Sequence, residues 1–197
     1  FAIQYFSYNA FILSNIKKKE IYTMEQLNKI FTKHIDEGRF PGIQWQINIK
    51  DKIYSGKIGY NDIETKDPVL DNTIYRIWSM TKPVVAVAGL QLLEQNKIKL
   101  DDLVTKYLPE FSNLKVLKKE NASIDEVEDL KINPTIKDLF LHTAGFSYNF
   151  LADPIGRMYD EVKLFHSDTT TLEEEIKKLA ELPLLYQPKN KWVYSVS

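Results

Sequence analysis

Residues 75–83 read Tyr-Arg-Ile-Trp-Ser-Met-Thr-Lys-Pro and lead directly into a nearly continuous apolar stretch, residues 84–93 (Val-Val-Ala-Val-Ala-Gly-Leu-Gln-Leu-Leu). Proline lacks an amide hydrogen and is tolerated in a helix only near its first turn, so Pro83 predicts a helix that begins close to Ser79. Apolar residues on almost every side predict that this helix is buried on most of its faces. The sequence therefore places Ser79 at the rigid N-terminus of a buried helix.

Ser79 and Lys82 form a Ser-x-x-Lys pair. A serine hydroxyl attacks a carbonyl only when a base takes its proton, and residues three apart on a helix share one face, with Cβ atoms about 5–6 Å apart. Apolar surroundings and the positive helix N-terminus both favour a neutral lysine amine, and the Ser79 N–H is a candidate oxyanion donor. The pattern alone is weak, because a capping serine and a solvated lysine produce it by chance in many helices.

The rest of the chain alternates between helical and strand-like segments. Alternating apolar residues over 43–49 and a strand-like run over 53–60, joined at Asp51-Lys52, predict a β-hairpin. The charged span 115–131 is interpreted as an exposed excursion. Helices are expected over 24–35 (capped by Thr23), 103–108, 136–142 (capped by Thr135) and 172–182 (capped by Thr171).

The composition excludes several functional classes. The 26 basic and 27 acidic residues leave a net charge of −1, which offers no electrostatic footprint for nucleic acid, so a small, roughly neutral substrate is the expected partner. There is no cysteine and only 3 scattered histidines, so we expect neither a metal nor another cofactor. No stretch approaches the roughly 20 apolar residues that span a bilayer. Residues 1–16 lack the basic start of a signal peptide, and both a cytoplasmic and a periplasmic location fit the sequence. The sequence does not indicate the oligomeric state.

The two ends suggest an incomplete gene product. The chain starts at Phe1 instead of methionine and closes on strand-like residues at 192–197 without a polar tail. We expect residues 1–22 to be a leader or non-core segment and residues 23–197 to be the N-terminal part of a hydrolase domain that is truncated at its C-terminus.

Three segments together resemble the serine β-lactamase-like superfamily, which includes class C β-lactamases, penicillin-binding proteins and carboxylesterases of the same fold. The first is the Ser79 segment. The second is residues 135–146, Thr-Ile-Lys-Asp-Leu-Phe-Leu-His-Thr-Ala-Gly-Phe, and the third is residues 192–196, Trp-Val-Tyr-Ser-Val, at the place of the family's Tyr-x-Asn element. The resemblance covers roughly residues 23–197.

The resemblance implies an α/β (α+β) fold of the β-lactamase/transpeptidase type, with an antiparallel sheet flanked by helices and a mostly helical subdomain. It implies an acyl-enzyme mechanism in which Ser79 is the nucleophile, Lys82 the base and Tyr194 a second acid/base. Val196 replaces the asparagine that usually contacts a polar substrate amide, which favours a carboxylesterase of small esters. A third family motif would lie beyond Ser197. The alternatives are a β-lactamase or D-alanyl-D-alanine carboxypeptidase, and a non-catalytic penicillin-binding-like module.

Several other residues near these motifs admit a structural interpretation. His142 occupies the family's turn position, so packing or turn stabilisation is favoured over a catalytic triad with Ser79. The aromatic residues Trp78, Phe146, Tyr148 and Phe150 line an acyl pocket in one interpretation and belong to the core in the other.

Overall fold

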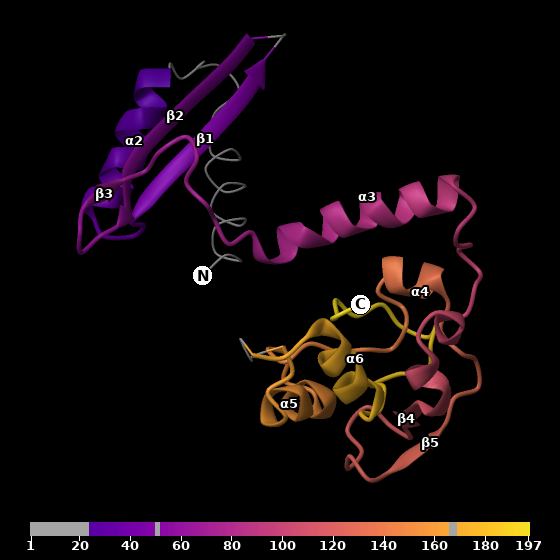
Figure 1. The fold of residues 1–197 in the computed structure, drawn as a ribbon. Helices are drawn as coiled ribbons and strands as arrows, with labels where there is room; N and C mark the ends of the chain where they lie inside the picture. Colours follow the sequence, from indigo (N-terminus) through magenta and orange to yellow (C-terminus); the bar gives the residue numbers. More distant parts are fainter. Residues whose placement is uncertain (1–23, 50–51, 166–168) are drawn as a thin grey trace. The chain divides into compact units, whose positions relative to one another are not determined.

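The computed structural model describes residues 24–49, 52–165 and 169–197, and Figure 1 traces them along the chain. They divide into two compact units, the first ending at Thr81 and the second formed by Lys82–Ser197. The expected leader over 1–22, the cap at Thr23 and Asp51 of the hairpin turn lie outside the described residues.

The first unit contains helix α2 (Met24–Asp36) and an antiparallel sheet of order β1-β2-β3. Its strands are β1 (Gly42–Ile49), β2 (Lys52–Asp62) and β3 (Asp67–Pro68). In the register of β1 and β2, Gly42 lies opposite Gly59 and Ile49 lies opposite Lys52. The predicted hairpin is confirmed.

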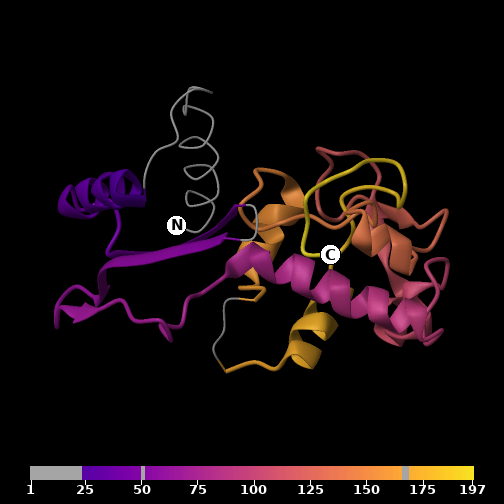
Figure 2. The same ribbon diagram turned by 90° about the horizontal axis from the view of Figure 1, so that it is seen from above.

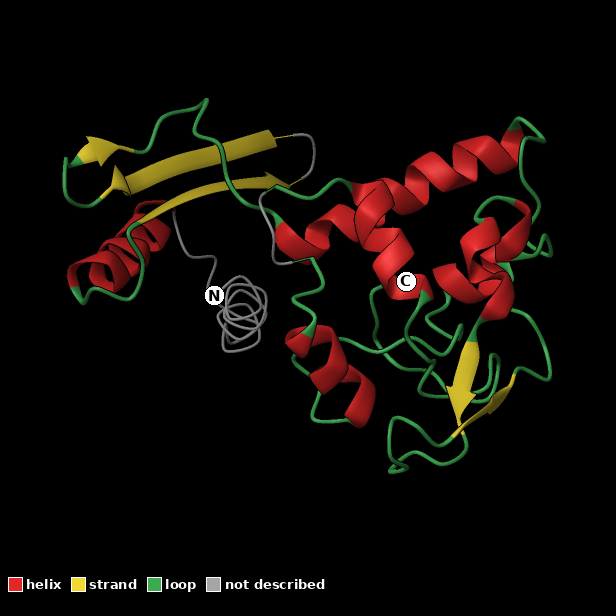
Figure 3. Cartoon of the chain, turned by 60° about the horizontal axis from the view of Figure 1, so that its bottom comes forward, coloured by secondary structure: helices red, strands yellow, loops and turns green. Residues whose placement is uncertain are grey.

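Helix α2 covers one face of the hairpin, as Figure 3 shows. Leu27 of α2 is buried, and the Phe31 ring centroid lies 6.3 Å from that of Trp45 on β1. The indole of Trp45 lies across the opposing strand, where a Cβ added to Gly56 would lie 2.6 Å from it. A side chain at position 56 would therefore displace the tryptophan on which α2 packs.

The second unit contains α3 (Thr81–Glu94, which starts one residue before the unit), the 3₁₀ turns η2 (Val104–Lys106) and η3 (Pro109–Asn113), the strands β4 (Lys115–Leu117) and β5 (Val127–Asp129), and the helices α4 (Ile136–Phe140), α5 (Pro154–Glu161) and α6 (Leu172–Ala180). Figure 2 shows α3 as one continuous helix. The core of this unit comprises Val104, Phe111, Leu114, Val116, Leu117, Ala144, Phe146, Ile155, Tyr159, Leu164, Leu179, Leu184 and Leu185.

The interpretation of residues 115–131 as an exposed excursion is wrong at the two ends of the span, whereas residues 118–126 are largely exposed. Strands β4 and β5 pair antiparallel here, and Val116 is completely buried. The amide of Leu117 donates to the Leu184 carbonyl at 3.0 Å, and that of Leu184 donates to the Lys115 carbonyl at 2.8 Å. The charged residues lie mainly in the connection between the two strands, and they obscured the few apolar residues that enter the core.

The expected burial of α3 is also wrong for the part of the chain that the structure describes. Val84, Val85 and Val87 are all more than half exposed. One close contact is at Gly89, where an added Cβ would lie 2.5 Å from the Phe140 ring of α4. A helix that is apolar all round can bury every face, but its own sequence does not determine which neighbours cover it.

Two predicted helices are confirmed together with their caps. Thr135 begins α4 and Thr171 begins α6, and each forms a capping box with the acidic residue three positions later. Helix α5 was missed, although Asp153 caps it and Pro154 occupies its first turn. Residues 103–108 form the shorter turn η2 instead of an α-helix.

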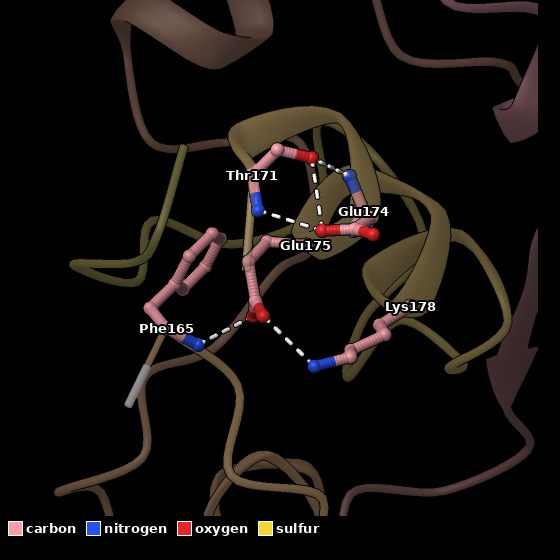
Figure 4. Close-up of polar contacts among 5 residues, drawn as sticks. All are labelled: Phe165, Thr171, Glu174, Glu175 and Lys178. Carbon is pink, nitrogen blue, oxygen red and sulfur yellow. Dashed lines mark hydrogen bonds and ion pairs between the residues drawn. The ribbon is translucent and has the colours of Figure 1, made fainter. Parts of the chain in front are cut away.

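The buried carboxylate of Glu175 ties α6 to the segment before it. Figure 4 shows Glu175 between the amide of Phe165, which donates to it at 2.6 Å, and the ammonium of Lys178 at 2.8 Å. Lys178 and the Phe165 N–H, in that order, lower the pKa of Glu175 from 4.5 to about 2. The folded protein therefore holds this side chain ionised.

We predict that Glu175→Gln lowers the free energy of unfolding at neutral pH by about 1–3 kcal/mol, because it weakens two charge-assisted hydrogen bonds. A folded-state pKa below the ordinary value contributes stability above pH 4.5 that is lost as the pH falls towards about 2. The difference between wild type and variant should therefore shrink below pH 4.5 in urea denaturation experiments.

Glu173→Gln is the matched control, because Glu173 pairs with Lys177 on the same helix but its side chain is 75% exposed. We expect this change to cost less than about 1 kcal/mol. Equal losses in the two variants, or a Glu175→Gln loss that does not vary with pH, would contradict the assignment.

Candidate active site

Ser79 lies in the 3₁₀ turn η1 (Trp78–Met80), which runs directly into α3. Lys82 is the second residue of α3 and Pro83 the third, so the predicted start of this helix near Ser79 is confirmed. Trp78 has a φ of +46°, in the left-handed region that large side chains rarely adopt, and such a conformation costs on the order of 1–3 kcal/mol. Strained backbone of this kind clusters at functional sites, and here it immediately precedes Ser79.

Within the second unit, Lys82 lies against two tyrosine rings. Its Nζ is 5.1 Å from the ring centroid of Tyr194 and 5.2 Å from that of Tyr148. The two rings are stacked, with centroids 5.7 Å apart and planes within 4° of parallel, and the Phe150 ring lies 4.5 Å from Tyr148. The structure thus joins the first turn of α3 to the segment that contains Tyr194.

The segment around Tyr194 is held by the turn that follows α4. The Val193 amide donates to the His142 carbonyl at 3.1 Å, and the Val196 amide donates to the Ser147 carbonyl at 3.1 Å. The Ser195 amide donates to Nδ1 of His142 at 3.2 Å. Tyr194 is therefore fixed through its own backbone neighbours.

Gly145 allows this turn and the later segment to approach each other. Its φ of +96° disfavours any side chain, and an added Cβ would collide with the Tyr186 carbonyl. The Leu185 amide donates to the Gly145 carbonyl at 2.8 Å, next to that point. A glycine is required because two backbones meet here.

Burial and charge shift two groups of this site. Burial, followed by the charge of Lys82, lowers the pKa of His142 below 6.5. Burial, followed by Tyr194, raises the pKa of Tyr148 above 10. Both groups are therefore neutral near pH 7.

Two of the three predicted catalytic residues, Lys82 and Tyr194, are brought together within the second unit. Ser79 precedes Lys82 by three residues along the helical backbone of η1 and α3, and its assignment rests on that spacing. Their catalytic roles stay predictions.

The aromatic residues divide between the two interpretations. Phe146 belongs to the core, where its ring centroid is 5.8 Å from that of Phe111. Tyr148 and Tyr194 lie beside Lys82, and the Phe150 ring lies near both tyrosine rings. The contact of the His142 ring with Ser195 was missed in the sequence; the only signal was that both belong to family motifs.

The described residues contain no group of three or more histidine, aspartate or glutamate side chains that could hold a metal ion. In the same ranges, no helix has the length and apolar character needed to cross a bilayer.

Comparison with known proteins supports the resemblance. The family model described as beta-lactamase matches residues 27–197. Protein Rv1367c of Mycobacterium tuberculosis is 32% identical over 81% of this chain and 39% of its own length, and esterase EstB of Burkholderia gladioli is 32% identical over 87% of this chain and 42% of its own length.

The solved structure of EstCE1, described as a hydrolase with promiscuous acyltransferase activity, matches with a TM-score of 0.72 and 30% identity over 87% of this chain and 43% of that one. The chain thus spans less than half the length of these proteins. Its helices and antiparallel sheets are the N-terminal portion of the β-lactamase/transpeptidase fold. The chain belongs to the beta-lactamase family.

Proposed function

We propose that this protein is a serine hydrolase that acts through an acyl-enzyme and cleaves small carboxylic esters. The observation that carries the proposal is the position of Lys82, three residues after Ser79 and against the ring of Tyr194. A nucleophile, a base and a second proton-transfer group are the parts that acyl transfer needs.

In the proposed reaction, Ser79 Oγ attacks the ester carbonyl while its proton passes to Lys82. The ammonium formed on Lys82 lies over the faces of Tyr194 and Tyr148, and aromatic faces attract cations. The Ser79 N–H is one proposed donor to the oxyanion.

Collapse of the tetrahedral intermediate breaks the bond to the alcohol oxygen, which takes a proton delivered through Tyr194 and Lys82. Water then attacks the acyl-serine, and its proton follows the reverse route, so that the carboxylic acid leaves and Ser79 is regenerated. The Tyr148 ring beside Lys82, with the Phe150 ring next to it, supports an apolar acyl group as substrate.

Val196 supports an ester substrate over a β-lactam. Its side chain packs against the core of the second unit, so this position offers no polar group to a substrate amide. The similarity to EstB, named as an esterase, supports the same choice. Nitrocefin turnover that exceeds ester cleavage would favour the β-lactamase alternative instead.

We predict that the complete gene product hydrolyses short-chain p-nitrophenyl esters and that Ser79→Ala lowers kcat by about 10⁴-fold or more, as loss of a nucleophile generally does. Mass spectrometry after reaction with a fluorophosphonate should locate the adduct on Ser79. Ser123→Ala, in the exposed connection between β4 and β5, is the control and should keep full activity.

An adduct on another residue would disprove the assignment of Ser79. A protein that is neither labelled nor active would support the non-catalytic penicillin-binding-like module.

We further predict that Lys82→Arg is nearly inactive although it keeps the positive charge, because a guanidinium has a pKa above about 12 and does not act as a neutral base. Steady-state kinetics with p-nitrophenyl butyrate measure the effect. Lys97→Arg, at an exposed position after the same helix, is the matched control and should behave as wild type. Substantial activity in Lys82→Arg would show that Lys82 supplies only positive potential.

A further inference from the structure

His142 binds the backbone on both sides of Tyr194. The Val193 N–H donates to the main-chain carbonyl of His142 at 3.1 Å, and the Ser195 N–H donates to the imidazole Nδ1 at 3.2 Å. Ser195 is buried, and its Oγ lies 3.2 Å from the same nitrogen. The His142 ring centroid is 5.1 Å from that of Tyr194. One residue thus restrains the residue before the tyrosine, the residue after it, and its ring.

The contact with the Ser195 amide favours one tautomer of the imidazole. An amide can donate only to a ring nitrogen that carries no hydrogen, so this contact favours a bare Nδ1 and a neutral ring with its proton on Nε2, and the Ser195 hydroxyl can donate to the same bare nitrogen. A proton on Nδ1 would point towards the Ser195 N–H and break this bond. When Nε2 carries a proton as well, the ring is a second cation near Lys82.

We propose that His142 is a positioning residue for Tyr194, whose neutral imidazole, protonated on Nε2, holds residues 193–195 in the geometry that acyl transfer needs. The inference rests on the proposed function for its catalytic consequence, whereas the hydrogen bond itself is independent of that function.

The surroundings of His142 oppose its protonation. Lys82 on α3 supplies positive charge, and Tyr194, on which Tyr148 stacks, contributes an aromatic ring. On α4, the Asp138 carboxylate already accepts from Thr135 and Thr143, with Lys189 Nζ 4.0 Å away. Burial and Lys82 keep the pKa of His142 below 6.5, so the required neutral form is present above pH 6.5 and is lost as the pH falls through that lower value.

Two substitutions of His142 test the Nδ1 acceptor while keeping the backbone conformation. His142 has a φ of +55°, and both asparagine and glycine tolerate this region. Asparagine places a carbonyl oxygen close to the position of Nδ1 and does not titrate, whereas glycine offers no acceptor. Both remove the ring, so they differ mainly in the hydrogen bond under test.

In the complete gene product, we predict that His142→Gly lowers kcat for p-nitrophenyl butyrate by about 10²-fold, as misplacement of a catalytic group by about 1 Å can do, with a much smaller change in KM. His142→Asn should stay within about tenfold of wild type. The ionisation of His142 measured by NMR should coincide with a loss of wild-type activity on the acid side, and that loss should be absent from the asparagine variant.

Imidazole ¹⁵N shifts of the wild-type protein provide the readout that needs no activity. We expect a bare Nδ1 and a protonated Nε2 at pH 7. A proton on Nδ1 would overturn the inference, and so would full activity in both variants or equal losses in the two. If His142→Gly does not fold, His142→Asn and the wild-type tautomer still decide the question.

Fluorophosphonate labelling of wild-type Ser79 distinguishes a failure of the proposed hydrolase function from a failure of the proposed role of His142. Labelled, active wild type with unaffected variants would overturn only the role of His142. Unlabelled, inactive wild type would overturn the proposed function and with it the catalytic consequence, while the tautomer would still decide the hydrogen bond.

Discussion

The position of Tyr194 depends on a short set of hydrogen bonds between the turn after α4 and the segment that ends the described chain. Four of them join backbone to backbone, and the fifth ends on a ring nitrogen. They run from Leu185 to Gly145, from Lys189 to Thr143, from Val193 to His142, from Val196 to Ser147, and from Ser195 to the His142 imidazole. Because three of these bonds come from Val193, Ser195 and Val196, the backbone is held on both sides of Tyr194 although the segment is irregular.

The turn itself is held by the side chain of Asp138 on α4. Asp138 accepts hydrogen bonds from the Thr135 and Thr143 hydroxyls and completes the cap at the start of the helix. The same carboxylate therefore fixes both the beginning of α4 and the first residue after His142. Cap, turn and tyrosine segment form one connected polar network over the core that contains Ala144 and Phe146.

Much of this arrangement could be predicted from the sequence, and the part that could not has a physical cause. Thr135 and Thr171 correctly predicted the starts of α4 and α6, because a capping box depends only on residues three positions apart in the sequence. The hairpin of β1 and β2 followed from strict alternation. Strands β4 and β5 escaped prediction because Val116 and Leu117 are covered by Leu184, a residue distant in the sequence. The exposed faces of α3 were mispredicted for the same reason, since burial depends on neighbours.

At the candidate site, sequence motifs predicted roles for Ser79, Lys82 and Tyr194, and the structure added how the last two meet. The stacking of Tyr148 on Tyr194 and the bond from Ser195 to His142 depend on how the turn and the tyrosine segment face each other. No local pattern encodes that pairing. The left-handed conformation of Trp78 likewise had no signal, since such a backbone is expected at glycine or asparagine.

The separation of Lys82 and Tyr194 along the chain also has a consequence for folding kinetics. Along the chain, η2, η3, the β4–β5 pair and α4 to α6 lie between the ammonium of Lys82 and the ring of Tyr194. Closing so long a loop costs entropy before any contact repays it, and contacts between distant residues slow folding. We therefore expect the contact between Lys82 and Tyr194 to form late in the folding of the second unit.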